Sequence, residues 1–558
     1  MSTQNFKMTE LKVNGMTCSG CEAHVKKALA SVPGVAKVCQ VDWKKGHACV
    51  ESKDEVDHGG LVAAIKNAGY TAEIIDPQIE KKDTINPKKN SQSSKDYDLL
   101  IFGSGSAAFA AAIKATELGK TVGIIEEKTL GGTCVNVGCV PSKTMIRAAE
   151  SKHRIEHTPF AGIAPNQTQI DFHKIVQEKD NLVSELRHAK YESIIKANPN
   201  ITLIQGRGQF LDSTTIQVGD KKITGEKILI ATGSSSFTPD IPGLKESGFL
   251  NSTTALELTS LPEHLVVLGG GYIALELSQM FARMGSKVTI IQRSEILFQE
   301  DKEISESLGE YLGAEGIKIL NHALVKKVNR SGKSLTIEIT RRGEPITIQA
   351  DEILVATGRK PNTIGLGLDA AGVSLKPNGA IQVNSFCQTT QPNIYAAGDV
   401  LDSPALVYVA AYEGNLAVEN AFSGNVRQAD YHTVPWVIFS DPQVAGVGLN
   451  EAQAKSQGVE YDVSLLTLDN VPRAIAARDT RGFVKLLRKT GTNELIGARI
   501  LAPEGSELIM ELSLILRYKI PLNEVASMFH PYLTLSEAVK LAAQTFDKDV
   551  KSLSCCAS

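Results

Sequence analysis

Alternating and periodic apolar positions divide the start of the chain into four strands and two helices. In four short runs apolar residues occupy every second position, which is typical of strands with one buried face. These runs are residues 11–13, 35–43, 47–51 and 71–75. Elsewhere apolar residues recur every three or four positions, as on one face of an amphipathic helix, at Val25, Leu29 and Val32 and then at Leu61, Ala64, Ile65 and Ala68. The order βαββαβ predicts a small ferredoxin-like domain over residues 1–75.

The pattern changes to that of an α/β protein further along the chain. Short strands of Val, Ile and Leu at residues 98–102 and 265–268 each lead into a glycine-rich turn and then a helix, as in dinucleotide-binding folds. From about Tyr431 no such turn occurs, and strands mix with helices at residues 507–517 and 535–545. The expected fold class is therefore α/β, with two Rossmann-like domains, an α+β domain and the small domain in front.

A polar segment separates the two patterns. Residues 76–95 carry two prolines and several lysines and have almost nothing to bury, so a flexible linker is expected there. The expected boundaries are 1–75 for the small domain, 76–95 for the linker, 96–245 and 363–430 for the two parts of the first nucleotide-binding domain, 246–362 for the second, and 431–558 for the α+β domain.

Length and charge narrow the classes of ligand. At roughly 100–200 residues per domain, 558 residues make room for several folding units. The 59 Lys and Arg residues nearly balance the 62 Asp and Glu residues without a long block of one sign, which argues against a nucleic-acid or anionic-membrane partner. The longest uncharged stretch, residues 99–113, is shorter than the ~20 residues of a membrane span, and the start lacks the apolar core of a secretory signal. We expect a cytoplasmic chain without membrane insertion that acts on a small ligand.

The first glycine-rich turn has the spacing of a dinucleotide site. Gly103, Gly105 and Ala108 form a GxGxxA motif after the first strand. The next strand ends at Glu126, at the place of an acid that accepts from ribose hydroxyls. The motif alone can be only a tight turn between strand and helix. With strand, helix and acid at this spacing it predicts a pyrophosphate site at the helix N-terminus.

The second glycine-rich turn differs in the residue that follows it. Gly269, Gly271 and Ala274 repeat the motif, but the next strand is followed by Gln292 and Arg293 instead of an acid. A cation there suits a 2′-phosphate, so NADPH is favoured over NADH, with a solvated surface arginine as the alternative. Two nucleotide sites in one chain indicate electron transfer between two cofactors.

The nine cysteines include three close pairs, which in a reducing compartment indicate metal or redox sites. The pair Cys134 and Cys139 lies in GGTCVNVGCVPSK, residues 131–143, near the start of a predicted helix. Cysteines at this spacing can come within disulfide distance, and the helix dipole lowers a thiol pKa. A structural disulfide without a redox role is the alternative.

This segment, both glycine-rich turns, the ATG motifs at 231–233 and 356–358 and AAGD at 396–399 resemble the flavin-dependent pyridine-nucleotide disulfide oxidoreductases over about residues 96–550. The resemblance implies FAD in the first site and NADPH in the second, and a homodimer in which each C-terminal tail reaches the other subunit's flavin. Further FAD contacts implied in this way are Gly132, Thr133, Lys143, Gly233 and Asp399.

The resemblance also assigns roles around the flavin. Cys139 is expected against the flavin as a thiolate, and Cys134 is expected to face the substrate. Lys143 and Glu276 are expected to form an ion pair, and Tyr272 is expected to cover the flavin until the nicotinamide enters.

The pair Cys18 and Cys21 lies in GMTCSGC, between the first strand and the first helix of the small domain. Two neighbouring thiolates before a helix suit a soft metal ion, and the segment resembles the heavy-metal-associated domains. A thioredoxin-like redox role is the alternative, but that motif belongs in a different fold.

The pair Cys555 and Cys556 lies close to the C-terminal end. A frayed tail with two idle thiols is one interpretation. The other is a dithiol that carries a soft ion between sites.

Together the three pairs resemble the branch of the oxidoreductase family that reduces mercury. The resemblance implies NADPH-dependent reduction of thiol-bound Hg(II) to volatile Hg(0) as a detoxification reaction, with the ion passed between cysteine pairs. A mercury transporter or an organomercurial lyase is the candidate donor. Tyr191 and Tyr532 match positions that line the mercury site, and Tyr408 is a weaker candidate.

Two alternatives stay open. A reductase of small or protein disulfides would use the tail cysteines as a relay, and a metallochaperone or sensor would use the flavin core only structurally. Against the first, Tyr532 stands where disulfide reductases need a histidine as proton donor, and His530 lies two residues too early. The remaining cysteines are interpreted as small core residues: Cys39, Cys49 and Cys387.

Overall fold

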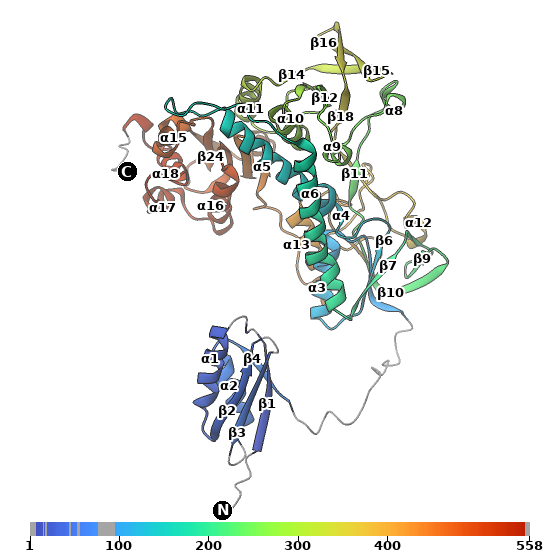
Figure 1. Ribbon diagram of the computed structural model, residues 1–558, viewed down its shortest axis with the longest axis vertical. Coiled ribbons are helices and arrows are strands. Elements are labelled where there is room, and N and C mark those ends of the chain that lie inside the picture. Colours follow the sequence, from blue (N-terminus) through green and yellow to red (C-terminus); the bar gives the residue numbers. More distant parts are fainter. Residues whose placement is uncertain are drawn as a thin grey trace, which may run out of the picture. The chain divides into compact units, whose positions relative to one another are not determined.

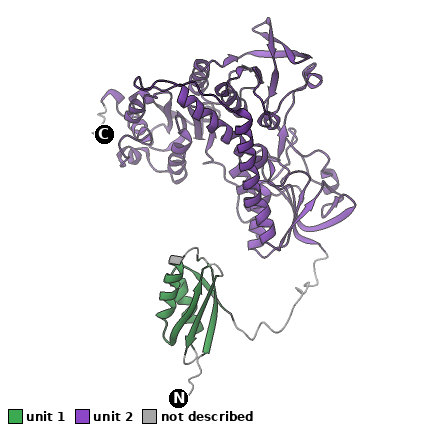
Figure 2. Ribbon diagram, in the orientation of Figure 1, with its two compact units in different colours: residues 1–94 green, residues 95–558 purple. Residues whose placement is uncertain are grey.

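The computed structural model describes residues 7–14, 16, 19–43, 46–52, 56–75 and 95–552. The chain forms two compact units, residues 1–94 and 95–558 (Figure 2). The expected linker up to residue 94 lies outside the described residues, as do Cys18, Cys555 and Cys556. The expectations placed on them therefore stay predictions.

The first unit has the order of elements that its hydrophobic pattern predicts. Its strands and helices are β1 (Lys7–Asn14), α1 (Ser19–Ala30), β2 (Val35–Asp42), β3 (His47–Ser52), α2 (His58–Asn67) and β4 (Thr71–Ile75). The strands form one antiparallel sheet in the order β2-β3-β1-β4, with α1 and α2 on one face (Figure 1). Leu11, Leu29 and Leu61 are fully buried between the sheet and the helices. The ferredoxin-like fold is confirmed.

The second unit begins with a nucleotide-binding domain built on a parallel sheet. Its parallel strands are β5 (Tyr97–Phe102), β6 (Val122–Glu126), β7 (Ile201–Gln205), β10 (Lys221–Ile230) and β20 (Ile394–Ala396). The antiparallel strands β8 (Gly208–Phe210) and β9 (Thr215–Val218) extend it at β10. Helices α3 (Ser106–Glu117) and α13 (Val407–Ser423) pack against each other with buried small residues beside this sheet. The late strand β20 shows that the domain is formed from two separate parts of the chain.

The other nucleotide-binding domain repeats this plan on a smaller sheet. Its parallel strands, in the order β14-β13-β12-β18, are β14 (Lys318–Leu320), β13 (Lys287–Ile291), β12 (His264–Leu268) and β18 (Glu352–Val355). Its helices are α10 (Tyr272–Met284) and α11 (Lys302–Ala314). An antiparallel meander of β15 (Ala323–Ser331), β16 (Ser334–Arg341) and β17 (Glu344–Ala350), which the sequence pattern did not predict, lies between β14 and β18 in the chain. Both expected Rossmann-like domains are confirmed.

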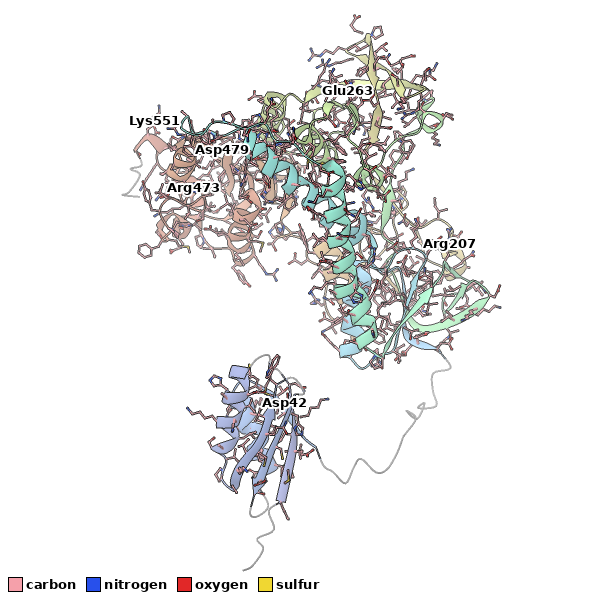
Figure 3. All side chains as sticks on the ribbon, viewed as in Figure 1. Asp42, Arg207, Glu263, Arg473, Asp479 and Lys551 are labelled. Carbon is pink, nitrogen blue, oxygen red and sulfur yellow. The ribbon has the colours of Figure 1, made fainter. Side chains whose placement is uncertain are left out.

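The C-terminal domain has an antiparallel sheet in the order β21-β22-β25-β24-β23. The strands are β21 (Trp436–Ile438), β22 (Gln443–Gly448), β23 (Tyr461–Thr467), β24 (Phe483–Lys489) and β25 (Leu495–Ala502). The helices are α14 (Glu451–Ser456), α15 (Pro472–Ala477), α16 (Gly505–Tyr518), α17 (Leu522–Ser527) and α18 (Glu537–Gln544). The expected α+β architecture is confirmed. Arg473 and Asp479, labelled in Figure 3, lie in and just after α15.

Long helices and short segments connect these domains. The cysteine segment continues into α4 (Gly132–Val137) and α5 (Cys139–Glu156), and α6 (Phe172–Arg187) follows. The short elements are α7 (Ser193–Ala197), β11 (Ser234–Ser236), α8 (Leu244–Ser247), α9 (Ser252–Leu256), β19 (Arg359–Pro361) and α12 (Leu368–Ala371). Among the residues described, no helix is both long and apolar enough to cross a membrane.

Buried ion pairs join the second nucleotide-binding domain to the C-terminal domain. The fully buried Lys485 ammonium lies 3.1 Å from Asp301 Oδ2 and 2.6 Å from Glu451 Oε1. Arg499, also buried, donates to Glu300 Oε2 at 2.7 Å. A buried charge is tolerated only when it is paired, so these contacts keep the two domains in one arrangement.

Candidate active site

Cys134 and Cys139 lie on two consecutive helices. Cys134 belongs to the short helix α4, and Cys139 is the first residue of the 18-residue helix α5. Gly138 between them has φ −123° and ψ −110°, which ends one helix before the next begins. The sequence pattern predicted a single helix start for both cysteines, so the expectation for Cys134 needs this correction. The turn brings the two thiol groups into a mutual hydrogen bond.

The two thiols differ in acidity. The hydrogen bond from Cys134 and the nearby Lys143 ammonium lower the pKa of Cys139 to about 7, and its place at the N-terminus of α5 acts in the same direction. The pKa of Cys134 is raised, because its proton is held in the bond to Cys139 and because it is partly buried. Above a pH of about 7 the pair therefore carries one proton and one negative charge that resides mainly on Cys139.

An ion pair lies beside this thiolate. Lys143 Nζ, one turn along α5 from Cys139, donates to Glu276 Oε2 on α10 at 2.7 Å. The other carboxylate oxygen of Glu276 accepts from the Phe439 backbone N–H at 2.9 Å. Lys143 Nζ also lies 4.8 Å from the centre of the Phe439 ring. The predicted Lys143–Glu276 pair is present, and Phe439, which the sequence did not single out, holds both members.

Tyr191 lies next to the cysteine pair within the same chain. It belongs to a π-helical turn, His188–Glu192, a local deviation found often at functional sites. Its ring packs edge-on against Phe109 with the ring centres 4.7 Å apart. Burial raises the pKa of Tyr191, and the neighbouring cysteine pair adds to this effect. The phenol is therefore neutral beside the thiols.

The first glycine-rich turn is held against the cysteine segment. A Cβ at Gly103, which has φ 92°, would lie 2.4 Å from the carbonyl oxygen of Ala231, so only glycine fits. Ser104 Oγ donates to Glu126 Oε2 at 2.6 Å and accepts from the Gly131 N–H at 3.1 Å. Gly105 is the N-cap of α3 and supplies no side-chain hydrogen bond to it. The first-turn N–H groups of α3 are therefore available to a phosphate.

The remaining residues expected at the first nucleotide site surround this turn. Ala108 is fully buried in α3, and Asp399 Oδ2 accepts from Ser234 Oγ at 3.0 Å. The other residues expected to contact FAD are Gly132 and Thr133, which begin α4, and Gly233, which lies in the turn before β11.

The second glycine-rich turn repeats this geometry. A Cβ at Gly269, with φ 122°, would lie 2.3 Å from the Ala356 carbonyl oxygen. Gly271 is the N-cap of α10 and again supplies no side-chain hydrogen bond, and Ala274 is fully buried. Arg293 follows β13 on an exposed position. Among the described residues no hydrogen bond or ion pair to Arg293 is present, so its guanidinium is available to an anion.

An aromatic stack stands at this second turn. Tyr272, the first residue of α10, stacks on Trp436 with ring centres 5.5 Å apart and planes 23° apart. The Arg499 guanidinium also lies over the indole, 5.4 Å from the ring centre. The Tyr408 hydroxyl donates to the Pro435 carbonyl, which places it near this stack and not among the thiols. Sequence reasoning missed Trp436, because no local motif marks a residue that only the fold brings to α10.

Tyr532 lies far from the thiols within one chain. It belongs to the loop between α17 and α18, which Figure 1 shows well apart from α4, and 49% of its surface is exposed. His530, two residues earlier, is paired with Glu511 at 2.8 Å. The predicted contact of Tyr532 with the mercury site therefore requires a second subunit.

Of the pair expected in the N-terminal unit, only Cys21 is described. It lies in the first turn of α1 and is half-buried against the core of that unit. Cys387 is buried in the first nucleotide-binding domain, as expected for a core residue.

Comparisons with known proteins agree with this geometry. Residues 97–414 match the pyridine nucleotide-disulphide oxidoreductase family, residues 434–543 its dimerisation domain, and residues 10–71 the heavy-metal-associated domain. A mercuric reductase of Lysinibacillus sphaericus is 44% identical over 99% of this chain and 100% of its own length. A mercuric reductase of Staphylococcus aureus is 44% identical over 100% of both chains.

A solved structure shows the same architecture. The Cu(II) complex of the HOCl-induced flavoprotein disulfide reductase RclA from Escherichia coli is 30% identical, with a TM-score of 0.73, and the match covers 82% of this chain and 100% of that one. The family match alone extends over more than half of the residues. The chain therefore belongs to the pyridine nucleotide-disulphide oxidoreductase family.

Proposed function

We propose that this protein is a mercury(II) reductase, which uses NADPH and FAD to reduce thiol-bound Hg(II) to Hg(0) and so detoxifies mercury. The observation that carries the proposal is the hydrogen-bonded pair Cys134 and Cys139, with one thiolate at neutral pH. The chain is similar to mercuric reductases along its whole length. Thiolate sulfur is the ligand that a soft ion such as Hg(II) prefers.

The two glycine-rich turns fit the two cofactors. Both α3 and α10 begin without a side-chain cap, so their first N–H groups can bind a pyrophosphate. Glu126 and Asp399 would hold hydroxyl groups of FAD, and Arg293 would hold the 2′-phosphate of NADPH. Bound at these turns, the two cofactors would supply the two-electron chemistry that links oxidation of NADPH to reduction of Hg(II).

The cysteines of the chain bind Hg(II) by ligand exchange. In each exchange one Hg–S bond to a carrier thiol breaks and one bond from Hg to a cysteine Sγ forms; the first departing thiolate takes the proton of Cys134, and the second leaves as a thiolate. Cys139 attacks as a thiolate because Lys143 and Cys134 stabilise its charge. Cys134 then supplies the proton that its hydrogen bond had held. The neutral Tyr191 phenol lies near the pair and would line the mercury site.

Delivery to this pair would use the other two cysteine pairs. Cys18 and Cys21 would receive Hg(II), and Cys555 and Cys556 would carry it to the site. In a homodimer, which the dimerisation domain supports, the tail cysteines and Tyr532 of one subunit would complete the site of the other. The cytoplasm, where NADPH and excess thiol are present, is the proposed location, with a mercury transporter or an organomercurial lyase as donor.

The deciding experiment is Hg(II)-dependent NADPH oxidation in excess thiol, with mercury vapour trapped and quantified. We expect mercury vapour in proportion to NADPH consumed. With glutathione disulfide, lipoamide or oxidised thioredoxin we expect negligible oxidation, because His530 is engaged by Glu511 and a tyrosine at position 532 is a poor proton donor near pH 7. Rapid reduction of any of these disulfides would overturn the proposal.

The choice of NADPH is tested at Arg293. A guanidinium that binds a 2′-phosphate makes charge-assisted hydrogen bonds worth about 1.5–3 kcal/mol. Arg293→Glu should therefore lower kcat/KM for NADPH by about 10-fold or more while changing that for NADH little. An equal loss with both coenzymes would show that Arg293 does not bind the phosphate.

A further inference from the structure

The strand β3 of the N-terminal unit places a cysteine on the face of the sheet opposite the helices. Ala48 and Val50 are fully buried in the core formed with α1 and α2. Successive side chains of a strand point to opposite faces, so Cys49 lies on the other face. Only 4% of Cys49 is exposed, which means that neighbouring side chains of this face cover its sulfur.

A bulge in β2 brings a second thiol to the same place. The register of β2 and β3 shifts between Val38 and Gln40, so that Cys39 and Gln40 together oppose Cys49. Val38 is buried in the core, and Cys39 therefore points to the open face. The strand ends shortly afterwards at Asp42, labelled in Figure 3. The two thiols lie close enough to influence each other's pKa and form no disulfide, and Cys39 Sγ donates to the Lys37 carbonyl at 4.0 Å.

Carboxylates surround this second thiol pair. Glu10 on β1 lies directly opposite Cys49, and Glu51 interacts with Cys39. His47 Nε2 lies 3.6 Å from Glu10 Oε2 at the edge of the group. Burial raises the pKa of Cys39 to about 11, with Glu51 adding to the effect, and burial also raises the pKa of Cys49. Both thiols therefore keep their protons near pH 7, and Lys37, the cross-strand partner of Glu51, lies on the same face.

The number of donors selects the kind of cation. Among the described residues no group of three or more His, Cys, Asp or Glu side chains could hold a metal ion. Zn²⁺ in structural sites takes four ligands, so it does not fit here. Two adjacent sulfurs suit a soft ion that accepts linear, two-coordinate binding, the chemistry of Hg(II) and Cu(I) with thiolates.

We propose that Cys39 and Cys49 form a second soft-metal site of the N-terminal unit, on the open face of its sheet, and that it binds Hg(II). The identity of the ion rests on the proposed function, whereas the site itself rests on the geometry of β2 and β3. Binding is ligand exchange: each cysteine forms one Sγ–Hg bond, one Hg–S bond to a carrier thiol breaks, and the proton of the cysteine leaves on that thiol.

This site is separate from the one expected at Cys18 and Cys21. Cys49 pairs with Glu10, four residues before β1 ends at Asn14, which corresponds to roughly 14 Å along the strand. Cys21 lies beyond that end, in α1, on the helical face of the sheet. One ion therefore cannot bridge the two places, and the unit would hold two ions.

The test measures protection of these cysteines from alkylation in the full-length, FAD-loaded protein, reduced, anaerobic and without NADPH. Hg(II) is added in excess glutathione, and the cysteines that are accessible in the native protein are alkylated with a light reagent. The protein is then denatured and mercury is removed with a dithiol. The cysteines that had not reacted are finally alkylated with a heavy reagent. Trypsin releases Cys39 in residues 38–44 and Cys49 in residues 46–53, so each is quantified alone. We expect Hg(II) to slow alkylation of Cys39 and Cys49 in parallel, by at least tenfold.

Matched variants separate a two-sulfur site from other causes. Cys49→Ser should abolish the protection of Cys39, and Cys39→Ser that of Cys49, whereas Cys18→Ser with Cys21→Ser should leave both protected. Protection that survives loss of the partner cysteine, or that disappears with Cys18 and Cys21, would overturn the proposal. The proposal would also be overturned if, in samples without Hg(II), Cys39 and Cys49 took up the heavy label only after treatment with the dithiol. Such a result would indicate a disulfide between them.

The same preparation distinguishes this site from the reductase activity. NADPH oxidation driven by Hg(II) reports on Cys134 and Cys139, and alkylation in the absence of NADPH reports on Cys39 and Cys49. Failure of the second site would leave mercury vapour production intact. Failure of the proposed function would remove the vapour but leave the protection measurable.

Discussion

Two cysteine pairs of this protein, Cys134/Cys139 and Cys39/Cys49, each bring two interacting thiols together, yet they have opposite protonation states. In the catalytic unit the hydrogen bond from Cys134, the Lys143 ammonium and a helix N-terminus favour the thiolate of Cys139. On the N-terminal sheet, burial and carboxylates favour the neutral thiols. The comparison teaches that a donating thiol, a nearby ammonium and a helix N-terminus favour a reactive thiolate, whereas burial beside carboxylates keeps a thiol protonated.

The largest effect is expected from removing the thiolate itself. Cys139→Ala or Cys134→Ala should lower Hg(II)-dependent NADPH oxidation by on the order of 10³-fold or more, as is typical for groups that bond to the substrate. Flavin absorbance should show that FAD is retained. Cys387→Ala, at a buried cysteine in the core of the first nucleotide-binding domain, serves as the control and should keep its turnover. Turnover above a tenth of the original rate in either active-site variant would contradict the assignment.

The next effect comes from removing the cation beside the active pair. Cys139 is deprotonated above its folded pKa of about 7 and protonated below it, so its reactivity falls as the pH drops through about 7. Lys143→Gln should move this pKa toward the ordinary thiol value of about 8.5 and reduce the thiolate fraction at pH 7 by about 10-fold. The pH profile of Cys139 alkylation measures it. A profile that does not move would show that the N-terminus of α5 and Cys134 are enough to keep the pKa of Cys139 at about 7 without Lys143.

A smaller and opposite effect is expected on the N-terminal sheet. Glu51→Gln removes a negative charge beside Cys39 and should lower the pKa of this thiol from about 11, by on the order of half a unit to one unit for a partly exposed neighbour. Alkylation of Cys39 at pH 8 should then be about three to ten times faster. Glu22→Gln, on α1 of the same unit, is the matched control. Equal acceleration in both variants would indicate general loosening of the unit.

The smallest effect is expected when the N-terminal pair is removed together with its unit. Deletion of residues 1–94 follows the boundary between the two compact units, so the reductase core should fold and bind FAD on its own. In excess thiol, kcat/KM for Hg(II) should change by less than about twofold, within the scatter of remote changes. When thiol is scarce, the truncated protein should capture Hg(II) less well than the full-length protein. It should therefore produce less mercury vapour when the two proteins are assayed in parallel. Loss of flavin after truncation would place the boundary elsewhere.

Features of the site that depend on neighbouring residues in the chain could be predicted from the sequence. The turn at Gly103 requires glycine because a Cβ would meet the Ala231 carbonyl, and this requirement leaves a motif. The spacing of Cys134 and Cys139 similarly indicated a joint site. The helix break at Gly138 was not predicted, because a glycine between two helical segments can also lie within one helix.

Contacts between distant segments were out of reach unless a family resemblance supplied them. Lys143 and Glu276 are 133 residues apart, and the resemblance alone suggested their pairing. Phe439 and Trp436 left no local signal, since each matters only where the C-terminal domain packs against α10. The meander β15–β17 was missed because its strands are exposed on one face and lack a glycine-rich turn.

The sequence by itself determined the order of domains, the two nucleotide turns and the presence of three cysteine pairs, because hydrophobic period, glycine spacing and thiol chemistry are local properties. Only the tertiary structure decided which thiol is ionised and that Cys39 and Cys49 form a fourth pair. A pKa depends on charges and burial that the fold brings together, and the register shift in β2 follows from how whole strands pair.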